Sequence, residues 1–397
     1  MEVHQRNIAW GPRMNLLTSF KTLDHRSPIV CFSHLRWDFV VQRPQHLMER
    51  FSRDRPVIFF EEFIPTDHHL AYFEVHCFEG TAVRAIRPRV PHWWSDAERQ
   101  TALSRLLDEV LSLFGWSKPV LWFYTPLMHS FARHVDAEAV VYDCMDELAN
   151  FKFAPPELKH AEGELLNRAN VVFTGGKSLF EAKNDRHANV HCFPSSVDVT
   201  HFSAARACAA APADQASIGS PRFGYIGVID ERIDLELVAS VARMRPDYSF
   251  VFVGPVVKIS PAALPQAANL HYLGRKSYLE LPAYLSGWHA ALMPFAHNDA
   301  TRYISPTKTP EYLAAGIPVV STRIADVVSG YGQTPGVFLV DGAKQFAEAC
   351  DEACRMDPTD TTWRAVIDEK LSQSSWDDTF AKMRALVEHA VTRELHG

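Results

Sequence analysis

The residues best suited to bind an anionic ligand lie in the segment Ser305-Pro-Thr307-Lys308, with Glu311 three residues further on. Two hydroxyls, a lysine and the free N–H groups at the start of a predicted short helix suit a phosphate group. Glu311, one turn into that helix, is placed to accept hydrogen bonds from both hydroxyls of a ribose. The alternative is a capped helix with an incidental lysine.

A second group of candidates follows two predicted strands in the same half of the chain. Gly227 and Gly254 end these strands, where a residue without a side chain lets the backbone approach a ligand closely. Asp230 and Arg232 follow Gly227, and Arg232 supplies a fixed positive charge for phosphate. One glycine is weak support for a ligand site, and its repetition at the next strand end strengthens the prediction.

Three carboxylates, Asp143, Asp146 and Glu147, stand together at the end of a predicted strand in the first half of the chain. Like charges this close are unfavourable unless they serve a function. They predict a general base or contacts to sugar hydroxyls. A helix cap would explain one of the three acids but not all of them.

Polar, aromatic and basic side chains also crowd the loop after the first predicted strand. They predict a ligand-facing loop that opens into a helix near Pro44, a residue suited to a first helical turn. The alternative is a surface loop with a buried tryptophan. The candidate ligand contacts here are His34, Trp37, Asp38, Arg43 and Gln45.

Short apolar runs alternate with helical patterns along the chain, which is typical of parallel sheets covered by helices on both faces. The sequence therefore predicts an α/β fold with two doubly wound domains that face a cleft. The expected strands are 28–33, 56–60, 120–124, 139–143, 170–174 and 190–193, then 222–226, 249–253, 269–273, 290–294, 318–321 and 337–340. The expected divisions are an irregular tail over 1–27, an N-terminal domain over 28–204, a linker over 205–220, a C-terminal domain over 221–370 and a final helical segment over 371–397.

Composition and missing motifs argue against several classes of function. The 397 residues carry a net charge of −7, and neither half has the basic excess that nucleic-acid binding by bulk charge requires. The sequence contains no G-x-x-x-x-G-K-[ST] or G-x-G-x-x-G motif at a strand end, which argues against NTP hydrolysis and nicotinamide chemistry. The 19 histidines have no metalloenzyme spacing, and no apolar run is long enough to cross a membrane. Seven scattered cysteines without a C-x-x-C pair favour a reduced, cytoplasmic compartment.

Three segments resemble the GT-B glycosyltransferases, specifically the retaining "group 1" family 4. Lys308–Ser321 resembles the family's E-A-M-A-(A/C)-G-x-P-V-V segment, and Phe193–Phe202 resembles its N-G-V-D-x-x-x-F segment before the interdomain linker. Ser375–Asp377 resembles the start of the final helix, which in GT-B enzymes crosses back onto the N-terminal domain.

The N-terminal motifs point to a subgroup. His34–Phe39, Arg43–His46 and Asp143–Glu147 resemble bacterial cell-surface polysaccharide transferases, including the teichuronic acid (TuaH-type) enzymes. The resemblance implies transfer of a sugar from a nucleotide diphosphate, which we expect to be UDP-linked, to a hydroxyl of a glycan or lipid-linked acceptor. No cofactor and no metal are expected beyond that co-substrate.

The resemblance also implies roles for the candidate residues. Lys308, Arg232 and the 305–307 backbone would neutralise the departing diphosphate, which is electrostatic stabilisation of a leaving group. The loop at Arg275 would read the base. The N-terminal candidates, with Asp143, would hold the acceptor, and Asp146 would position or deprotonate its hydroxyl.

The sequence departs from the family pattern at the donor site. Tyr303 stands where the first of two glutamates eight positions apart is expected, and Glu311 matches the second. Val228 and Ile233 stand where a phosphate-binding arginine and lysine are expected, so Arg232 and Lys308 are the replacements. These departures leave the donor sugar and the retention of configuration open.

Two rival functions fit the same scaffold. The missing first glutamate favours a catalytically silent sugar-nucleotide-binding scaffold protein, and a nucleotide-sugar 2-epimerase would share the fold. Trp93 and Trp94, downstream of three arginines, also fit a peripheral contact with the inner membrane, although a buried or acceptor-facing pair fits equally well.

Overall fold

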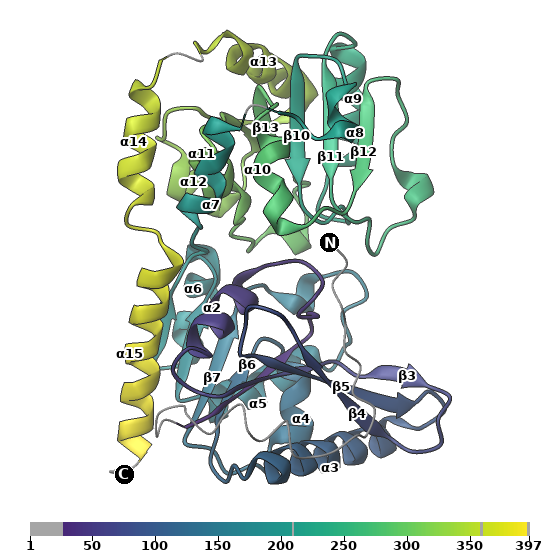
Figure 1. Ribbon diagram of the computed structural model, residues 1–397, viewed down its shortest axis with the longest axis vertical. Coiled ribbons are helices and arrows are strands. Elements are labelled where there is room, and N and C mark those ends of the chain that lie inside the picture. The colour runs from purple at the N-terminus through teal and green to yellow at the C-terminus, as the bar shows by residue number, and fades with distance from the viewer. Residues whose placement is uncertain (1–26, 209, 358–359, 395–397) are drawn as a thin grey trace.

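The computed structural model describes residues 27–208, 210–357 and 360–394. It folds into two α/β bodies, one above the other in Figure 1, each built on its own sheet. The predicted α/β fold with two mostly parallel sheets is confirmed. The irregular tail predicted over 1–27 lies outside the described residues except for its last residue.

The N-terminal sheet has the strand order β3-β5-β2-β1-β6-β7-β8-β9, with β4 antiparallel to β5 at one side. Its other pairings are parallel. The strands are β1 (Ile29–Ser33), β2 (Val57–Glu61), β3 (Ile64–Thr66), β4 (Tyr72–Cys77), β5 (Arg84–Pro91), β6 (Val120–Phe123), β7 (Ala139–Cys144), β8 (Val171–Thr174) and β9 (Val190–Cys192). The helices are α2 (Arg43–Phe51), α3 (Asp96–Phe114), α4 (His129–Ala132), α5 (Leu158–Arg168) and α6 (Lys177–Lys183), followed by α7 (Val199–Ser203) and α8 (Ala213–Ala216).

Helices cover both faces of this sheet, which is why its central strands are apolar throughout. Val30 and Phe32 face one core with α3, α4 and α5, whereas Ile29 and Cys31 face a second core with α2. The two-residue alternation of strand side chains places neighbours in opposite cores.

The C-terminal sheet is entirely parallel among the described residues, in the order β12-β11-β10-β13-β14-β15. The strands are β10 (Arg222–Ile226), β11 (Ser249–Val253), β12 (Leu270–Gly274), β13 (Ala290–Met293), β14 (Val319–Thr322) and β15 (Val337–Val340). The helices are α9 (Leu235–Met244), α10 (Leu281–Leu285), α11 (Lys308–Ala314), α12 (Ala325–Tyr331), α13 (Gly342–Arg355) and α14 (Thr362–Leu371). The order reverses between β10 and β13, and ligands of doubly wound sheets bind at such a switch point.

The final helix returns to the first domain. α15 (Trp376–Glu394) runs down the side of the N-terminal domain in Figure 1, and its Trp376, Met383 and Val387 join the core under α2. Beside the crossing, the Val197 N–H donates to the carbonyl of Ser374 at 3.1 Å. The chain thus passes between the domains twice at one place, and the exact boundaries remain a prediction.

The edge formed by β3, β4 and β5 is absent from the predicted strands. β5 carries three arginines and two prolines, so it lacks the continuous apolar run of a buried strand. Arginine and proline are tolerated there because these strands lie at the side of the sheet.

Arg43 and Asp143 form a buried ion pair between α2 and the end of β7. Their side chains are 2% and 0% exposed, and the shortest N–O distance is 2.9 Å. Arg43 also donates to the carbonyl of Phe193 at 2.7 Å and approaches the sulfur of Met383 in α15. The prediction that these two residues contact the acceptor is therefore wrong, because both side chains are buried. They join the ends of β7 and β9 to α2 and α15 instead.

We expect Arg43→Met to destabilise the protein by about 3–5 kcal/mol, because it leaves Asp143 charged and unpaired in the core. The double variant Arg43→Met/Asp143→Leu should recover most of that loss. Urea unfolding measures both.

Arg53→Met is the matched control just beyond the end of α2, since Arg53 is 61% exposed and pairs with exposed Glu49. Its effect should stay below about 0.5 kcal/mol. Equal losses in the single and double variants would contradict the assigned role of the pair.

Candidate active site

Charged side chains from both domains converge between the two sheets. Asp146 follows β7, Arg232 follows β10, and Lys308 is the first residue of α11. Arg232 and Lys308 both act electrostatically on the Asp146 carboxyl, as do Asp230 and Lys258. The structure therefore brings together the three predicted catalytic residues, which come from loops more than 75 residues apart.

Arg232 is oriented by its own loop. Asp230 accepts from Nε at 2.9 Å and from Nη2 at 2.7 Å, and also from the backbone N–H of Arg232 at 3.0 Å. The Arg232 side chain remains 24% exposed, whereas that of Asp230 is 5% exposed. A bidentate carboxylate thus fixes the guanidinium while part of it stays open to the cleft.

The lysine of the cluster occupies space that a glycine leaves free. A Cβ at Gly227 would lie 2.4 Å from Cε of Lys308, and a Cβ at Gly254 would lie 1.9 Å from the carbonyl oxygen of Gly227. Their φ angles, 142° and 153°, also disfavour a side chain. Packing within the protein therefore requires glycine at both predicted positions. The absence of a side chain at Gly227 leaves the space that the Lys308 side chain occupies.

Burial dominates the electrostatics of the cluster. It raises the pKa of Asp146 to about 6, against the opposing effect of Arg232 and Lys308. It raises the pKa of Glu311 to about 7, although Lys308 and a hydrogen bond from Thr307 act in the other direction. It also lowers the pKa of Lys308, and the neighbouring Arg232 adds to that effect. Displaced pKa values of this kind are typical of functional sites.

Three predicted donor contacts are used within the protein. Arg275 donates through Nη2 to the carbonyls of Asp38 and Phe39 and lies over the Phe39 ring at 5.4 Å, so it joins the domains. Its role in reading the base stays a prediction. Ser305 lies against the start of α6, where a Cβ at Gly176 would be 2.6 Å from its Cβ. The Thr307 side chain forms a hydrogen bond with the Glu311 carboxyl.

The predicted acceptor loop is mostly tied to the N-terminal domain. The Trp37 ring packs edge-on against Phe59 at 5.1 Å, which is the buried-tryptophan alternative. Asp38 pairs with Arg87 at 2.7 Å. Gln45 accepts from the N–H of Gln42 and donates to the Trp37 carbonyl, as a capping box does. These three residues make structural contacts, and the acceptor contacts predicted for them remain predictions.

His34 differs from the other residues of that loop. Burial lowers its pKa to about 4, with a further contribution from Lys258 of the other domain. Its Nδ1 is buried and has no hydrogen-bond partner within the described residues. It is the one predicted acceptor residue that the structure leaves facing the opposite domain with an unused polar atom.

Two residues of the cleft were missed by the sequence analysis. Lys258, after β11, has a left-handed φ of 62°, and its ammonium lies 4.9 Å from the centre of the Phe151 ring. Neither residue belongs to a recognisable motif, and only the tertiary structure brings them together. Tyr303, at the position of the missing glutamate, packs against the N-terminal core instead of entering the cluster.

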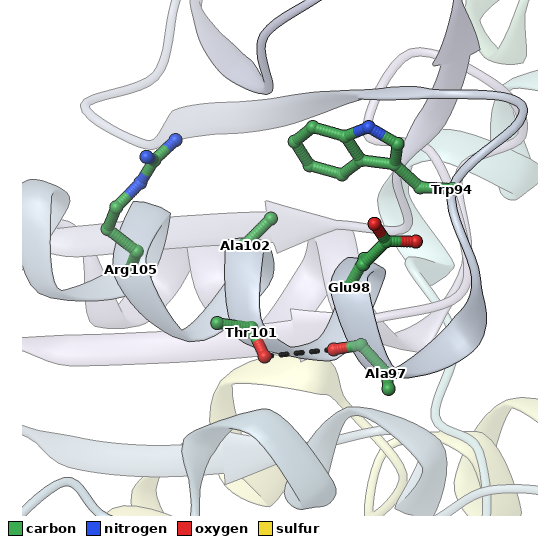
Figure 2. A pocket seen from close by; sticks show the side chains of 6 residues that line it. All are labelled: Trp94, Ala97, Glu98, Thr101, Ala102 and Arg105. Atoms are coloured by element: carbon green, nitrogen blue, oxygen red, sulfur yellow. Dashed lines mark hydrogen bonds between the residues drawn. The ribbon is translucent and has the colours of Figure 1, made fainter.

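Two surface hollows lie outside the cluster. One, of about 420 Å³, is on the outer side of α3 beneath Trp94 (Figure 2). Trp94 packs partly into the core and Trp93 is 48% exposed, so the predicted membrane contact remains a prediction. The other, of about 450 Å³, lies between the domains and includes Glu147, Arg302 and Tyr303.

Two further properties bear on the site. Within 27–208, 210–357 and 360–394, no three His, Cys, Asp or Glu side chains are grouped to hold a metal ion. None of the helices described there is long and apolar enough to span a membrane.

The fold and the cluster define a two-domain α/β protein with a group of charged side chains at the switch point of its second sheet. Residues 220–355 match the family model "Glycosyl transferases group 1". Over 283 residues the chain is 26% identical to TuaH of Bacillus subtilis, whose name describes a candidate teichuronic acid biosynthesis glycosyltransferase. That match covers 65% of this chain and 70% of the relative.

Solved structures agree on the fold. A sucrose-phosphate synthase from Thermosynechococcus elongatus superposes with a TM-score of 0.70 at 15% identity, covering 93% of this chain and 100% of that one. HepE of Anabaena, solved with UDP and glucose, gives 0.65 at 11% identity, with 91% and 100% covered. The chain has the GT-B fold and carries a glycosyltransferase group 1 domain over residues 220–355, so the comparisons support a glycosyltransferase.

We expect Glu311→Gln to stabilise the nucleotide-free protein at pH 8 and to leave it unchanged at pH 5. A carboxyl whose folded pKa lies near 7, above its unfolded value, binds more protons when folded, so its ionisation destabilises the fold as pH rises from about 4 to 7. The difference should reach roughly 3 kcal/mol and raise the melting temperature by a few degrees.

The matched control is Glu348→Gln, an exposed glutamate on α13 that faces exposed Lys344. Thermal unfolding at the two pH values should show no difference for it. A Glu311→Gln effect of equal size at both pH values would contradict the raised pKa.

Proposed function

We propose that the enzyme transfers a sugar from a UDP-linked donor to a hydroxyl of a glycan or lipid-linked acceptor in bacterial surface polysaccharide synthesis. The C-terminal domain holds the nucleotide at the switch point of its sheet. The N-terminal domain presents the acceptor. The enzyme acts on the cytoplasmic side, and the exposed Trp93 is a candidate contact with the membrane surface.

The observation that carries this proposal is the pair of cations, Arg232 and Lys308, opposite Asp146 across the domain boundary. Two fixed positive charges in a partly desolvated site stabilise the negative charge that develops on a leaving diphosphate. They supply this charge from the protein itself, so the proposed reaction requires no metal. Glu311, one turn along α11, accepts the ribose hydroxyls.

In the proposed reaction Asp146 lies beside the acceptor hydroxyl. In a same-face reaction the acceptor oxygen forms its bond to the anomeric carbon while the bond to the diphosphate breaks. The acceptor proton passes to the departing phosphate oxygen, and configuration is retained. Asp146 orients the acceptor hydroxyl in this scheme and takes no covalent part.

The names of relatives support the donor and the pathway. TuaH is named for teichuronic acid biosynthesis, and HepE was solved with UDP and glucose. Polysaccharide synthesis and a UDP-linked donor are the assignments that agree with both.

The experiment is a thermal-shift screen with UDP, GDP, ADP and TDP sugars, followed by transfer assays on variants. UDP sugars should give the largest stabilisation. Lys308→Ala should lower kcat by about 10²–10³, because a preorganised charge at the leaving group is lost. Glu311→Ala should mainly weaken donor binding, and Asp146→Asn should slow transfer without weakening UDP binding.

Lys344→Ala, at a lysine that is 84% exposed on α13, is the control and should behave as wild type. Wild-type rates in all three site variants would refute the site. Tight UDP binding without transfer to any acceptor would favour the silent scaffold protein. Conversion of the donor without an acceptor would favour the 2-epimerase.

A further inference from the structure

One aromatic ring of the N-terminal domain receives two cations of the C-terminal domain. The guanidinium carbon of Arg232 lies 5.5 Å from the centre of the Phe151 ring, and Nζ of Lys258 lies 4.9 Å from it. Cations within about 6 Å of a ring centre are attracted by its quadrupole. Arg232 and Lys258 follow different strands, β10 and β11, so a single side chain organises two loops of the opposite domain.

The neighbours of Phe151 also dock on the C-terminal domain. The side-chain amide of Asn150 donates to the carbonyl of Asp299 at 3.1 Å. The backbone N–H of Lys152 donates to the carboxylate of Glu231 at 3.3 Å. Both hydrogen bonds are exposed, and neither involves Arg232 or Lys258. They attach the segment around Phe151 to the C-terminal domain but do not orient the two cations.

Lys258 has a backbone conformation that needs support. A φ of 62° lies in the left-handed region, which is unfavourable for a residue with a side chain. The adjacent Val257 N–H donates to the carbonyl of Ile229 at 3.0 Å, which ties this loop to the one that carries Arg232. The contact with Phe151 is the part of this arrangement that the other domain supplies.

Arg232 is therefore held by one residue of its own domain, Asp230, and by one residue of the opposite domain, Phe151. Asp230 belongs to its own loop and holds it whatever the position of the domains. Phe151 reaches it only when the domains approach, and that approach also brings Asp146, five residues earlier in the chain, opposite Arg232 and Lys308.

We propose that Phe151 is a positioning residue that orients Arg232 and Lys258 when the domains close, so that full affinity for the diphosphate depends on closure. This inference rests on the proposed function, in which Arg232 binds the diphosphate of a UDP-linked donor. Phe151 itself touches no reacting atom in this scheme.

The experiment measures UDP affinity by isothermal titration for the full chain and its variants. Phe151→Leu keeps an apolar side chain and removes the ring, so UDP binding should weaken by about 5–30-fold, the factor for one to two cation–π contacts. Phe151→Trp restores an aromatic face and should return the affinity to within about twofold of wild type. Melting temperatures should not change in either variant, since Phe151 belongs to neither core.

Phe153→Leu is the matched control. Phe153 lies two residues away in the same loop and is 77% exposed; within the part of the chain that the structure describes, the one cation over its ring is that of its neighbour Lys152. It should bind UDP as wild type does. A loss equal to that of Phe151→Leu, or a failure of Phe151→Trp to restore binding, would overturn the positioning role.

A double-variant cycle separates this inference from the proposed function. If Phe151 acts through Arg232, then Phe151→Leu should cause little further loss in an Arg232→Ala background. Additive losses would overturn the inference. Wild-type UDP affinity in Arg232→Ala would instead overturn the proposed site, and unchanged affinity in Phe151→Leu alone would leave that site standing while the positioning role fails.

Discussion

The structure depends on placing opposite charges together at the boundary between two sheets. Asp146, Asp230 and Glu311 would each be unfavourable in a partly desolvated cleft without Arg232 and Lys308. The compensation is incomplete, because burial still raises the pKa of Asp146 and of Glu311. A site that is costly to the fold in this way is typical of a functional centre whose charges await a ligand.

The rest of the fold holds this cluster in register. The reversal of strand order between β10 and β13 places the Arg232 loop beside the loop that leads to Lys308. The Arg43–Asp143 pair holds the end of β7, three residues before Asp146. Because Arg43 also contacts Phe193 and Met383, the same buried pair reaches the interdomain crossing and the returning helix. The ion pair that stabilises the fold and the cluster proposed to bind the ligand therefore both lie at the carboxyl ends of strands.

The contacts between the domains fall into two groups. Some are structural, such as Arg275 on the carbonyls of the 38–39 turn and Asp326 on the N–H of Ser178. Others involve the cluster itself, above all Phe151 with its two cations. The first group of contacts fixes the relative position of the two domains. The second group makes the orientation of Arg232 and Lys258 depend on that relative position. A cleft enzyme gains by this, because water is excluded when the site is complete.

The sequence by itself determined the α/β class and most buried strands, because apolar runs are local properties. The Lys308–Glu311 spacing is local too, and it predicted where the site of the second domain lies. It also brought Asp146 to attention, since acids at a strand end are conspicuous. Only the tertiary structure decided that Trp37, Arg43, Gln45 and Asp143 are structural, because a polar side chain's partner lies far away in the chain. Phe151 shows the same limit from the other side: its function depends on cations more than 80 residues away, which no local pattern contains.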